Sequence, residues 1–334
     1  MLESAGNTPS RHRPSAGGVV VSWPGNNPAE VGRWPHRHLL DVDQLTREEL
    51  ERCLDLAVEM RERRARREPQ DLLRGEVVGL VFCEPSTRTR VSFQLAAEAL
   101  GAQVVELPID VSSVTKGESL LDTLRTLERT GVTTVVLRHS MSGAPYLAAR
   151  SVAVRIVNAG DGLHAHPTQA LLDALTLRDA LGTLEGRRIA IVGDIAHSRV
   201  ARSNLHSLTA LGATVCLAGP PAWVRGFEGW PGVSVAHRIE EALADADAVM
   251  TLRVQLERDA GGGVPSLREY TTRWGLDTRR LEHARSNAPV LHPGPTNEGV
   301  EISSELATSE RSLIGAQVVN GVAMRMAVLA LLAE

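Results

Sequence analysis

The sequence predicts an α/β protein of two domains, each a mainly parallel sheet flanked by helices. Short β-branched and apolar runs alternate along the chain with segments of helical periodicity, which is the pattern of βαβ units. Polar residues follow the carboxyl ends of several of these runs, where open parallel sheets bind ligands. The length of 334 residues is enough for two hydrophobic cores.

The composition argues against several classes of function. The chain is 43% hydrophobic and 23% charged, and its net charge of -4 argues against a general nucleic-acid or membrane surface role. Its apolar stretches are expected to be too short to span a bilayer. Cys53, Cys83 and Cys216 lie too far apart for a metal-ligand motif, and the N-terminus has no apolar signal-peptide region. These features predict a cytoplasmic protein.

The first 36 residues differ in composition from the rest of the chain. Residues 1–36 are rich in Gly, Pro, Ser, Asn and Arg and have no periodicity, which predicts a disordered N-terminal extension. The segment 39–64 has the spacing of an amphipathic helix. Thr46 lies at its N-cap position and Glu49 follows three residues later, as in a capping box.

A short polar segment separates the first predicted strand, 77–82, from a helix over 91–101. Its polar members are Ser86, Thr87, Arg88 and Thr89. Backbone N–H groups and the positive end of a helix dipole converge at such a turn, and the hydroxyls and the guanidinium add donors. The segment therefore predicts a phosphate site, although a Ser/Thr helix cap with an exposed arginine fits these four residues equally well.

The same alternation continues through the first domain. The predicted elements are strands over 103–107, 132–137 and 152–157 and a helix over 120–129. A polar loop, 110–118, carries Lys116, the single lysine among 36 basic residues. A lysine kept where all other basic residues are arginine indicates that a compact ammonium is needed, at an active site or an interface.

A second unit follows the helix that opens at His166. Its predicted elements are strands over 189–194, 215–218 and 248–252 and helices over 198–211 and 239–244. A final apolar helix, 316–334, is expected to pack back on the first domain. The predicted domains are 37–167 and 168–315, with one sheet on each side of a cleft that holds the active site.

Six polar side chains of the first unit lie at carboxyl ends of predicted strands. They are Ser86, Arg88, Thr89, Arg138, His166 and Gln169. Because such ends meet at one edge of a parallel sheet, we expect these side chains to face a common ligand. Each also fits a structural role alone: Arg138 as a polar strand end, and His166 as a helix-cap residue before a proline.

Seven motifs, in order, make the chain resemble the aspartate/ornithine carbamoyltransferase family. They are FCEPSTRTRVSF (82–93), SSVTKGES (112–119), LRH (137–139), NAGDGLHAHPTQALLD (158–173), VGDIAHSRV (192–200), TLRVQLER (251–258) and LHPGPTNEGVEI (291–302). The resemblance runs from about His38 to the C-terminus. It implies a transferase that needs no metal and no cofactor.

The resemblance implies that the first domain binds carbamoyl phosphate and the second binds aspartate. The implied carbamoyl-phosphate residues are Ser86, Thr87, Arg88, Thr89, Ser112, Lys116, Arg138, His166, Gln169, Gly294 and Pro295. The implied aspartate residues are Lys116, Arg199, Arg253 and Gln255. The implied catalytic residues are Arg88, Thr89, Lys116, Arg138 and His166. Ser112 and Lys116 match residues that reach a neighbouring subunit's site, which implies a homotrimer, and Glu84 and Arg258 match residues that help the domains close.

The implied reaction transfers the carbamoyl group of carbamoyl phosphate to the amine of L-aspartate, in de novo pyrimidine biosynthesis. The ornithine branch is the first alternative. It is disfavoured because the late motif, residues 292–295, lacks the cysteine typical of that branch, and because Arg253 and Gln255 suit a dicarboxylate. A catalytically silent scaffold is the second alternative, and it predicts a loss of cationic site residues that the sequence does not show.

Two further points complete the comparison with the family. A dinucleotide-binding domain is disfavoured because residues 192–200 lack the glycine fingerprint. Glu298 stands where many relatives carry a basic residue. The sequence leaves open whether regulatory chains or a dihydroorotase partner bind.

Overall fold

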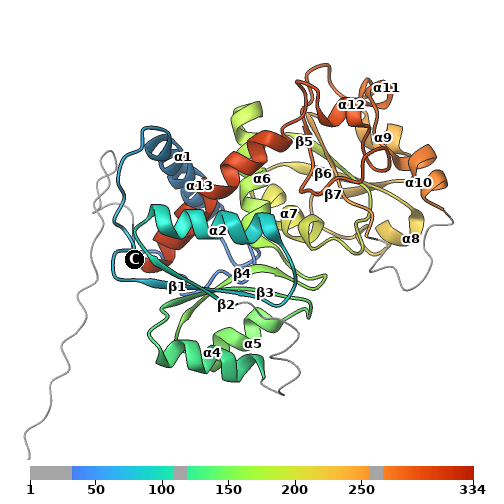
Figure 1. The fold of residues 1–334 in the computed structure, drawn as a ribbon. Coiled ribbons are helices and arrows are strands. Elements are labelled where there is room, and N and C mark those ends of the chain that lie inside the picture. Colours follow the sequence, from blue (N-terminus) through green and yellow to red (C-terminus); the bar gives the residue numbers. More distant parts are fainter. Residues whose placement is uncertain (1–31, 108–118, 256–265) are drawn as a thin grey trace, which may run out of the picture. The chain divides into compact units, whose positions relative to one another are not determined.

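The structure is a computed structural model that describes residues 32–107, 119–255 and 266–334 (Figure 1). Its contacts divide the chain into two units, Met1–Pro35 with Glu334, and His36–Ala333. The second unit contains the two sheets and is described below. Most of the predicted N-terminal extension lies outside the described residues.

The first sheet has four parallel strands in the order β2-β1-β3-β4. They are β1 (Val77–Phe82), β2 (Gln103–Leu107), β3 (Thr134–His139) and β4 (Arg155–Asp161). In the register of the two central strands, Phe82 lies opposite Arg138. The chain that leaves β1 toward Ser86 therefore starts beside the end of β3.

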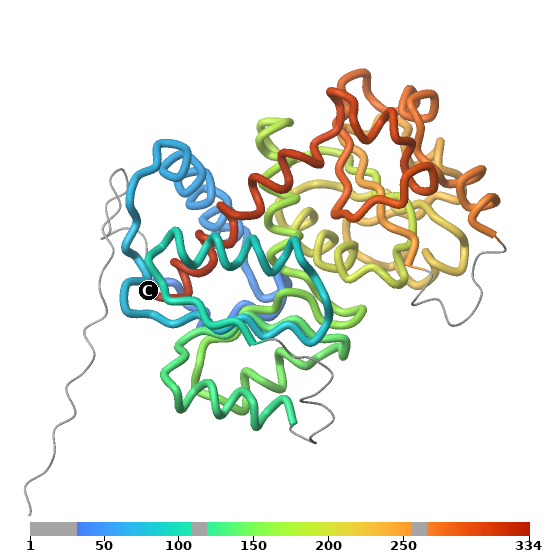
Figure 2. Tube along the Cα trace, in the orientation of Figure 1, coloured from blue at the N-terminus to red at the C-terminus, as the bar shows by residue number. Residues whose placement is uncertain are grey.

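Helices cover both faces of this sheet, as the ribbon and the tube show (Figures 1 and 2). On one face lie α1 (Arg47–Ala65), α2 (Thr87–Ala99) and α13 (Ile314–Ala333), and α13 packs against both of the others. On the other face lie α4 (Leu120–Arg129) and α5 (Ala144–Ser151). Right-handed crossovers require this division, because the chain moves from β1 to β2 in one direction and from β2 to β3 in the other.

The helix α13 is long and apolar enough to cross a membrane by length and composition. The expectation that no apolar stretch has that length is therefore wrong for this segment. However, 78% of its most apolar window is buried within the fold. It packs against α1, α2 and α6 (Pro167–Leu181), as the core helix of a folded domain does.

The second sheet has five parallel strands in the order β7-β6-β5-β8-β9. They are β5 (Arg188–Val192), β6 (Thr214–Ala218), β7 (Val233–Ala236), β8 (Ala248–Thr251) and β9 (Val290–Leu291). The helices of this part of the chain, besides α6, are α7 (Arg199–Ala210), α8 (Pro221–Val224), α9 (Ile239–Leu243), α10 (Leu267–Trp274), α11 (Thr278–Leu281) and α12 (Ser304–Ala307). Because β8 lies on the opposite side of β5 from β6, α7 and α9 cover opposite faces of the sheet.

The order of strands reverses once in each sheet. The reversal lies between β1 and β3 in the first sheet and between β5 and β8 in the second. Open α/β sheets bind ligands at such points, beyond the carboxyl ends of the strands. Arg138 is the next-to-last residue of β3, Arg199 follows β5 and Arg253 follows β8. The topology therefore positions the predicted site residues at both reversal points.

Several predicted boundaries are wrong by a few residues. The strand predicted over 152–157 is β4, Arg155–Asp161, because a helix that the sequence reading missed, α5, runs to Ser151. The strand predicted over 132–137 is β3, Thr134–His139. Both strands extend through polar residues that were predicted as loop. Asn158 and Asp161 have no exposed surface, and their side chains are hydrogen-bonded to each other. The strand therefore continues through these polar residues beyond the end of its apolar run.

Candidate active site

Two buried arginines share one carboxylate at the centre of the candidate site. Arg199 donates to both Glu84 carboxylate oxygens, at 3.1 and 2.5 Å, and Arg138 donates to one of them. Arg138 Nη1 also donates to the Ala159 carbonyl at 3.1 Å. A Cβ on Gly160 would lie 3.0 Å from an atom of each guanidinium, so a side chain at this position would displace the pair. Glu84 thus joins an arginine near the end of β3 to one that follows β5.

The segment Ser86–Thr89 opens α2, as the sequence predicts. Ser86 occupies the N-cap position with extended backbone, yet its side chain makes no capping hydrogen bond. The alternative of an ordinary Ser/Thr cap is therefore not what the structure shows. Thr89 is buried and Arg88 is exposed. The first N–H groups of α2 and the Ser86 hydroxyl form a set of donors suited to an anion.

His166 lies at the N-cap of α6, close to the two arginines. Burial lowers its pKa well below the ordinary value of 6.5, and the charges of Arg138 and Arg199 lower it further. Its backbone N–H donates to the Ser203 hydroxyl at 3.0 Å. Its Nδ1 is buried without a hydrogen-bond partner among the described residues. The structure thus presents a neutral imidazole with an unused ring nitrogen next to two cations.

A second group of cations consists of Arg88, which belongs to the predicted phosphate segment, and Arg253. Partial burial, and then the charge of Arg253, lower the pKa of Arg88. A Cβ on Gly294 would lie 3.4 Å from the Arg88 guanidinium carbon, so the 292–295 turn packs directly on that group. Arg88, Arg253 and Gly294 come from three distant parts of the sequence. The fold brings them together.

The turn that carries Gly294 is held by a buried pair. His292 Nδ1 accepts from the Gly294 N–H at 2.8 Å, and His292 Nε2 lies 3.1 Å from Glu301 Oε1. The same Glu301 oxygen accepts from the Asn297 N–H at 2.6 Å. His292 therefore carries its proton on Nε2, since its Nδ1 accepts a hydrogen bond. Sequence reasoning missed Glu301.

Gln255, predicted to bind aspartate, is fixed by the chain that follows β5. Its backbone N–H donates to Asp194 at 3.2 Å and its Nε2 to the His197 carbonyl at 3.1 Å. Asp194 in turn lies 2.8 Å from His197 Nδ1. The Gln255 amide nitrogen is thus used within the protein, and its carbonyl oxygen makes no hydrogen bond among the described residues. Asp194 and His197 are supporting residues that the sequence reading did not single out.

Three predicted residues lie outside the described part of the chain. They are Ser112, Lys116 and Arg258. Their assignments stay predictions. Within the described residues, Gln169 is buried one turn into α6 and donates from Nε2 to Asp173 at 2.9 Å. A glutamine and an aspartate four residues apart on a helix form a recognisable pair, which is the signal that could have identified Asp173.

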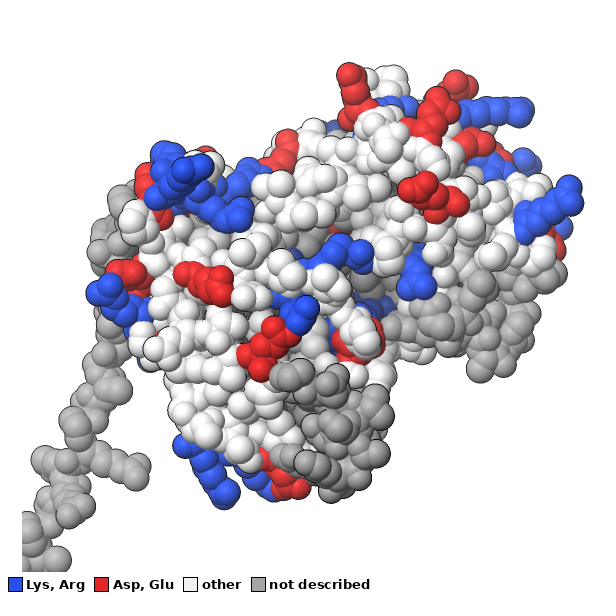
Figure 3. Space-filling view, in the orientation of Figure 1, with Lys and Arg blue, Asp and Glu red and all other residues white. Residues whose placement is uncertain are grey.

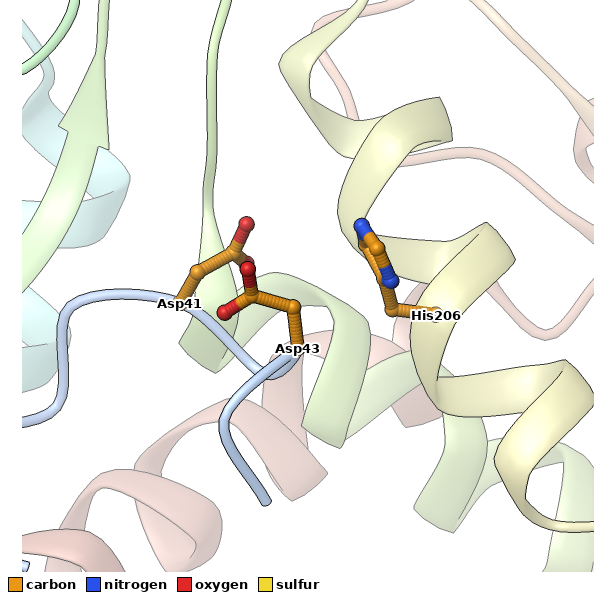
Figure 4. Close-up of side chains that lie close together, drawn as sticks. All are labelled: Asp41, Asp43 and His206. Atoms are coloured by element: carbon orange, nitrogen blue, oxygen red, sulfur yellow. The ribbon is translucent and has the colours of Figure 1, made fainter.

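One group among the described residues could hold a metal ion (Figure 4). A donor atom from each of Asp41, Asp43 and His206 lies within 4.8 Å of the other two. Asp41 already accepts from the Ser203 hydroxyl and the Val42 N–H, each at 2.8 Å, and burial raises its pKa. Asp43 is exposed beside a pocket of about 460 Å³ that His206 also lines. Exposed acidic groups commonly lie this close without a cation, so we assign no metal here.

The surface charge is mixed. On the face drawn in Figure 3, basic and acidic side chains of the described residues are interspersed. Basic side chains and an acidic group border a hollowed region near the middle of this face. The mixed charge on this face differs from the extended basic surface that is typical of nucleic-acid binding.

Comparison with known proteins identifies the family. A family model described as the carbamoyl-P binding domain of aspartate/ornithine carbamoyltransferase matches residues 37–179. A second, described as the Asp/Orn binding domain of the same family, matches residues 185–332. The chain belongs to the aspartate/ornithine carbamoyltransferase family. Both halves of the fold described above are therefore those of an aspartate/ornithine carbamoyltransferase.

Individual relatives of this carbamoyltransferase chain agree. The aspartate carbamoyltransferase catalytic subunit of Gluconacetobacter diazotrophicus is 54% identical over 299 residues, 89% of this chain and 93% of that protein. Aspartate transcarbamoylase from Trypanosoma cruzi, in complex with carbamoyl phosphate and aspartate, has a TM-score of 0.79 at 30% identity, covering 88% of this chain and 94% of that one. Ornithine carbamoyltransferase from Pyrococcus furiosus has a TM-score of 0.80 at 27% identity, covering 90% and 98%.

Proposed function

We propose that the chain transfers the carbamoyl group of carbamoyl phosphate to the amine of L-aspartate, giving N-carbamoyl-L-aspartate and phosphate. In this reaction a neutral amine attacks the carbamoyl carbon to form a tetrahedral intermediate. A C–N bond forms and the C–O bond to phosphate breaks. A proton leaves the amine and passes to the departing phosphate.

The observation that carries the proposal is the convergence of Arg138 with a neutral, buried His166, where Arg138 bonds to Glu84 in the segment between β1 and α2. The carbonyl oxygen of carbamoyl phosphate becomes negatively charged in the intermediate, and Thr89, Arg138 and His166 supply donors of the kind that stabilise an oxyanion. A donor of this kind contributes about 3–4 kcal/mol in comparable enzymes. Because the imidazole is neutral, it serves better as a hydrogen-bond donor than as a charged acid.

The phosphate fits the second set of donors. Ser86, Thr87 and the first N–H groups of α2 surround the positive end of the helix, and Arg88 adds a fork of guanidinium donors. The packing of Gly294 against Arg88 supports the placement of the 292–295 turn at the same ligand. Positioning and charge neutralisation of this kind promote displacement of phosphate without a covalent intermediate.

Aspartate is favoured over ornithine as the acceptor. Arg199 and Arg253 are cations that suit two carboxylates, whereas a second amine would be repelled by them. Relatives at half identity or more are called aspartate carbamoyltransferase catalytic subunits, and the ornithine enzyme is more distant at 27% identity. The finer parts of the proposal are a cytoplasmic homotrimer, with Ser112 and Lys116 serving a neighbour's site, and a place in pyrimidine biosynthesis.

The test is a product assay. Purified protein is incubated with carbamoyl phosphate and either aspartate or ornithine, and the carbamoylated product is quantified. Carbamoyl-aspartate alone is the expected result. Citrulline would keep the carbamoyl-phosphate site but overturn the choice of acceptor, and no product with either acceptor would favour a silent scaffold.

A further inference from the structure

A single buried carboxylate, that of Asp173, accepts hydrogen bonds from three side-chain amides. Its Oδ1 accepts from Gln169 Nε2 at 2.9 Å and from Gln317 Nε2 at 2.7 Å. Its Oδ2 accepts from Asn204 Nδ2 at 2.9 Å. Asp173 has no exposed surface, and its partners come from α6, α13 and α7. One carboxylate therefore joins three helices directly behind the candidate site.

The carboxylate determines which way the Gln169 amide points. An ionised carboxylate only accepts hydrogen bonds, so the atom of Gln169 that faces it must be the NH₂ group. The carbonyl oxygen Oε1 of Gln169 then lies on the other side of the amide. Gln169 is one turn from His166, in the first turns of α6. The group available to a substrate is therefore an acceptor.

The other two amides hold the carboxylate in place. Gln317 cannot reverse its amide freely, because its Oε1 accepts from the His292 N–H at 3.0 Å. Asn204 is held likewise, because its Nδ2 also donates to the Val200 carbonyl at 3.0 Å. Asp173 is thus a fixed acceptor. Gln169 and Asn204 each have an amide oxygen that makes no hydrogen bond between described residues, but the Asn204 oxygen is sealed in the interior, whereas Gln169 lies in the first turn of α6 beside His166.

The family resemblance implies that Gln169 binds the NH₂ group of the carbamoyl donor. We propose that Asp173 is the positioning residue that turns the Gln169 carbonyl oxygen toward this group. This inference rests on the proposed function. A carbamoyl group and an acetyl group have nearly the same shape and differ in NH₂ against CH₃. An oriented acceptor at this point binds the first and leaves a buried oxygen without a donor in the second, so it makes the site selective for a carbamoyl donor.

The burial of Asp173 is consistent with this role. Burial raises its pKa to about 6, so an ionised carboxylate at neutral pH is unfavourable for the fold at this position. Well-packed apolar residues often replace buried charges without loss of stability. The hydrogen bonds from the three amides offset part of the cost of burying the charge.

The test compares two stable ligands that differ only at the group in question. Phosphonoacetamide carries NH₂ where 2-oxopropylphosphonate carries CH₃, and the two share the phosphonate, methylene and carbonyl. Their dissociation constants are measured by calorimetry on the intact protein. The wild type is expected to prefer the amide. Asp173→Leu, which keeps the volume but removes the acceptor, is expected to reduce this preference at least about fivefold.

Two variants serve as matched comparisons. Asp173→Asn keeps an oxygen for the two glutamines, since Gln317 is anchored at His292, and should retain most of the preference. Gln317→Leu removes another partner of the same carboxylate. It is expected to weaken both ligands alike and to leave their ratio nearly unchanged, because Asn204 still holds the carboxylate that orients Gln169.

The outcomes separate the inference from the proposed function. A folded Asp173→Leu protein with the wild-type preference would overturn the role of Asp173 alone. Wild-type protein that binds neither phosphonate would overturn both. If Asp173→Leu does not fold, the wild-type complex with phosphonoacetamide decides: Gln169 still bonded to Asp173, with Oε1 on the ligand nitrogen, supports the inference, and a Gln169 turned away from Asp173 contradicts it.

Discussion

At the scale of single residues, Glu84 is the anion that two buried arginines share. The exposed fractions of the side chains are 19% for Glu84, 10% for Arg138 and 7% for Arg199, so the network is poorly screened by water. Glu84→Ala is expected to lower the free energy of unfolding by about 3 kcal/mol, because both guanidinium groups lose a charged partner. Urea denaturation measures the change.

The control for this prediction is an ion pair on the surface. Arg66 and Glu68 are 55% and 45% exposed and lie 2.6 Å apart. Glu68→Ala is expected to change stability far less than Glu84→Ala does, because water and salt screen the pair. Equal losses in the two variants would mean that burial of the Glu84 network is unimportant.

The depressed pKa of His166 predicts a dependence of stability on pH. When the pH falls below 6.5, His166 becomes protonated in the unfolded chain but stays neutral in the folded protein. The unfolded state then binds more protons, so stability falls as pH decreases below about 6.5. His166→Gln lacks this term and is expected to lose less stability than the wild type between pH 7 and pH 5. Parallel curves from thermal or urea denaturation would contradict the assignment of a neutral His166.

At the scale of elements, two helices have a Ser or Thr residue at the N-cap position, but the two residues have different roles. Thr46 caps α1 in a reciprocal capping box with Glu49, whereas Ser86 at the start of α2 makes no capping bond. Thr46→Ala is expected to cost about 1 kcal/mol of stability and to leave the KM for carbamoyl phosphate unchanged. Ser86→Ala is expected to leave stability unchanged and to raise that KM several-fold.

Denaturation and steady-state kinetics on both variants test this contrast. A stability loss in Ser86→Ala comparable to that of Thr46→Ala would mean that Ser86 acts as an ordinary helix cap and would contradict the prediction. A Ser or Thr residue precedes the helix in both places, so the residue type alone does not predict which one forms a cap. Only the hydrogen bonds of the folded chain distinguish them.

Strands show where sequence patterns stop being informative. The strands 77–82 and 103–107 have the predicted bounds, since apolar runs end there at polar or turn residues. The β4 strand runs on through Asn158 and Asp161, because these side chains bond to each other and to neighbouring backbone in the interior. Periodicity cannot predict a polar strand end whose partners lie elsewhere in the chain.

At the scale of the whole molecule, the predicted trimer can be tested by combining variants of two subunits. Lys116→Ala is expected to abolish turnover while the protein remains a folded trimer, because the lysine would serve a neighbour's site. Arg138→Met is expected to inactivate the site in its own chain. Trimers assembled from both variants should recover activity, since some sites then combine an intact Arg138 with an intact Lys116.

Activity is measured after mixing, unfolding and refolding the two proteins together, and assembly is measured by light scattering. Each variant refolded alone is the control. Normal activity of Lys116→Ala, or mixtures no more active than their components, would contradict shared sites. A monomer in solution would contradict the trimer itself.

The sequence alone determined the fold class, the strand-to-helix phosphate segment and the residues that follow strand ends, because local periodicity and turn chemistry depend on neighbours in the chain. It also carried the motifs by which the family could be proposed. The tertiary structure decided which of these groups meet. Glu84 bridging Arg138 and Arg199, Gly294 on Arg88, and Asp173 among three amides join positions far apart in sequence. Such contacts depend on strand order and helix packing, which no local pattern encodes.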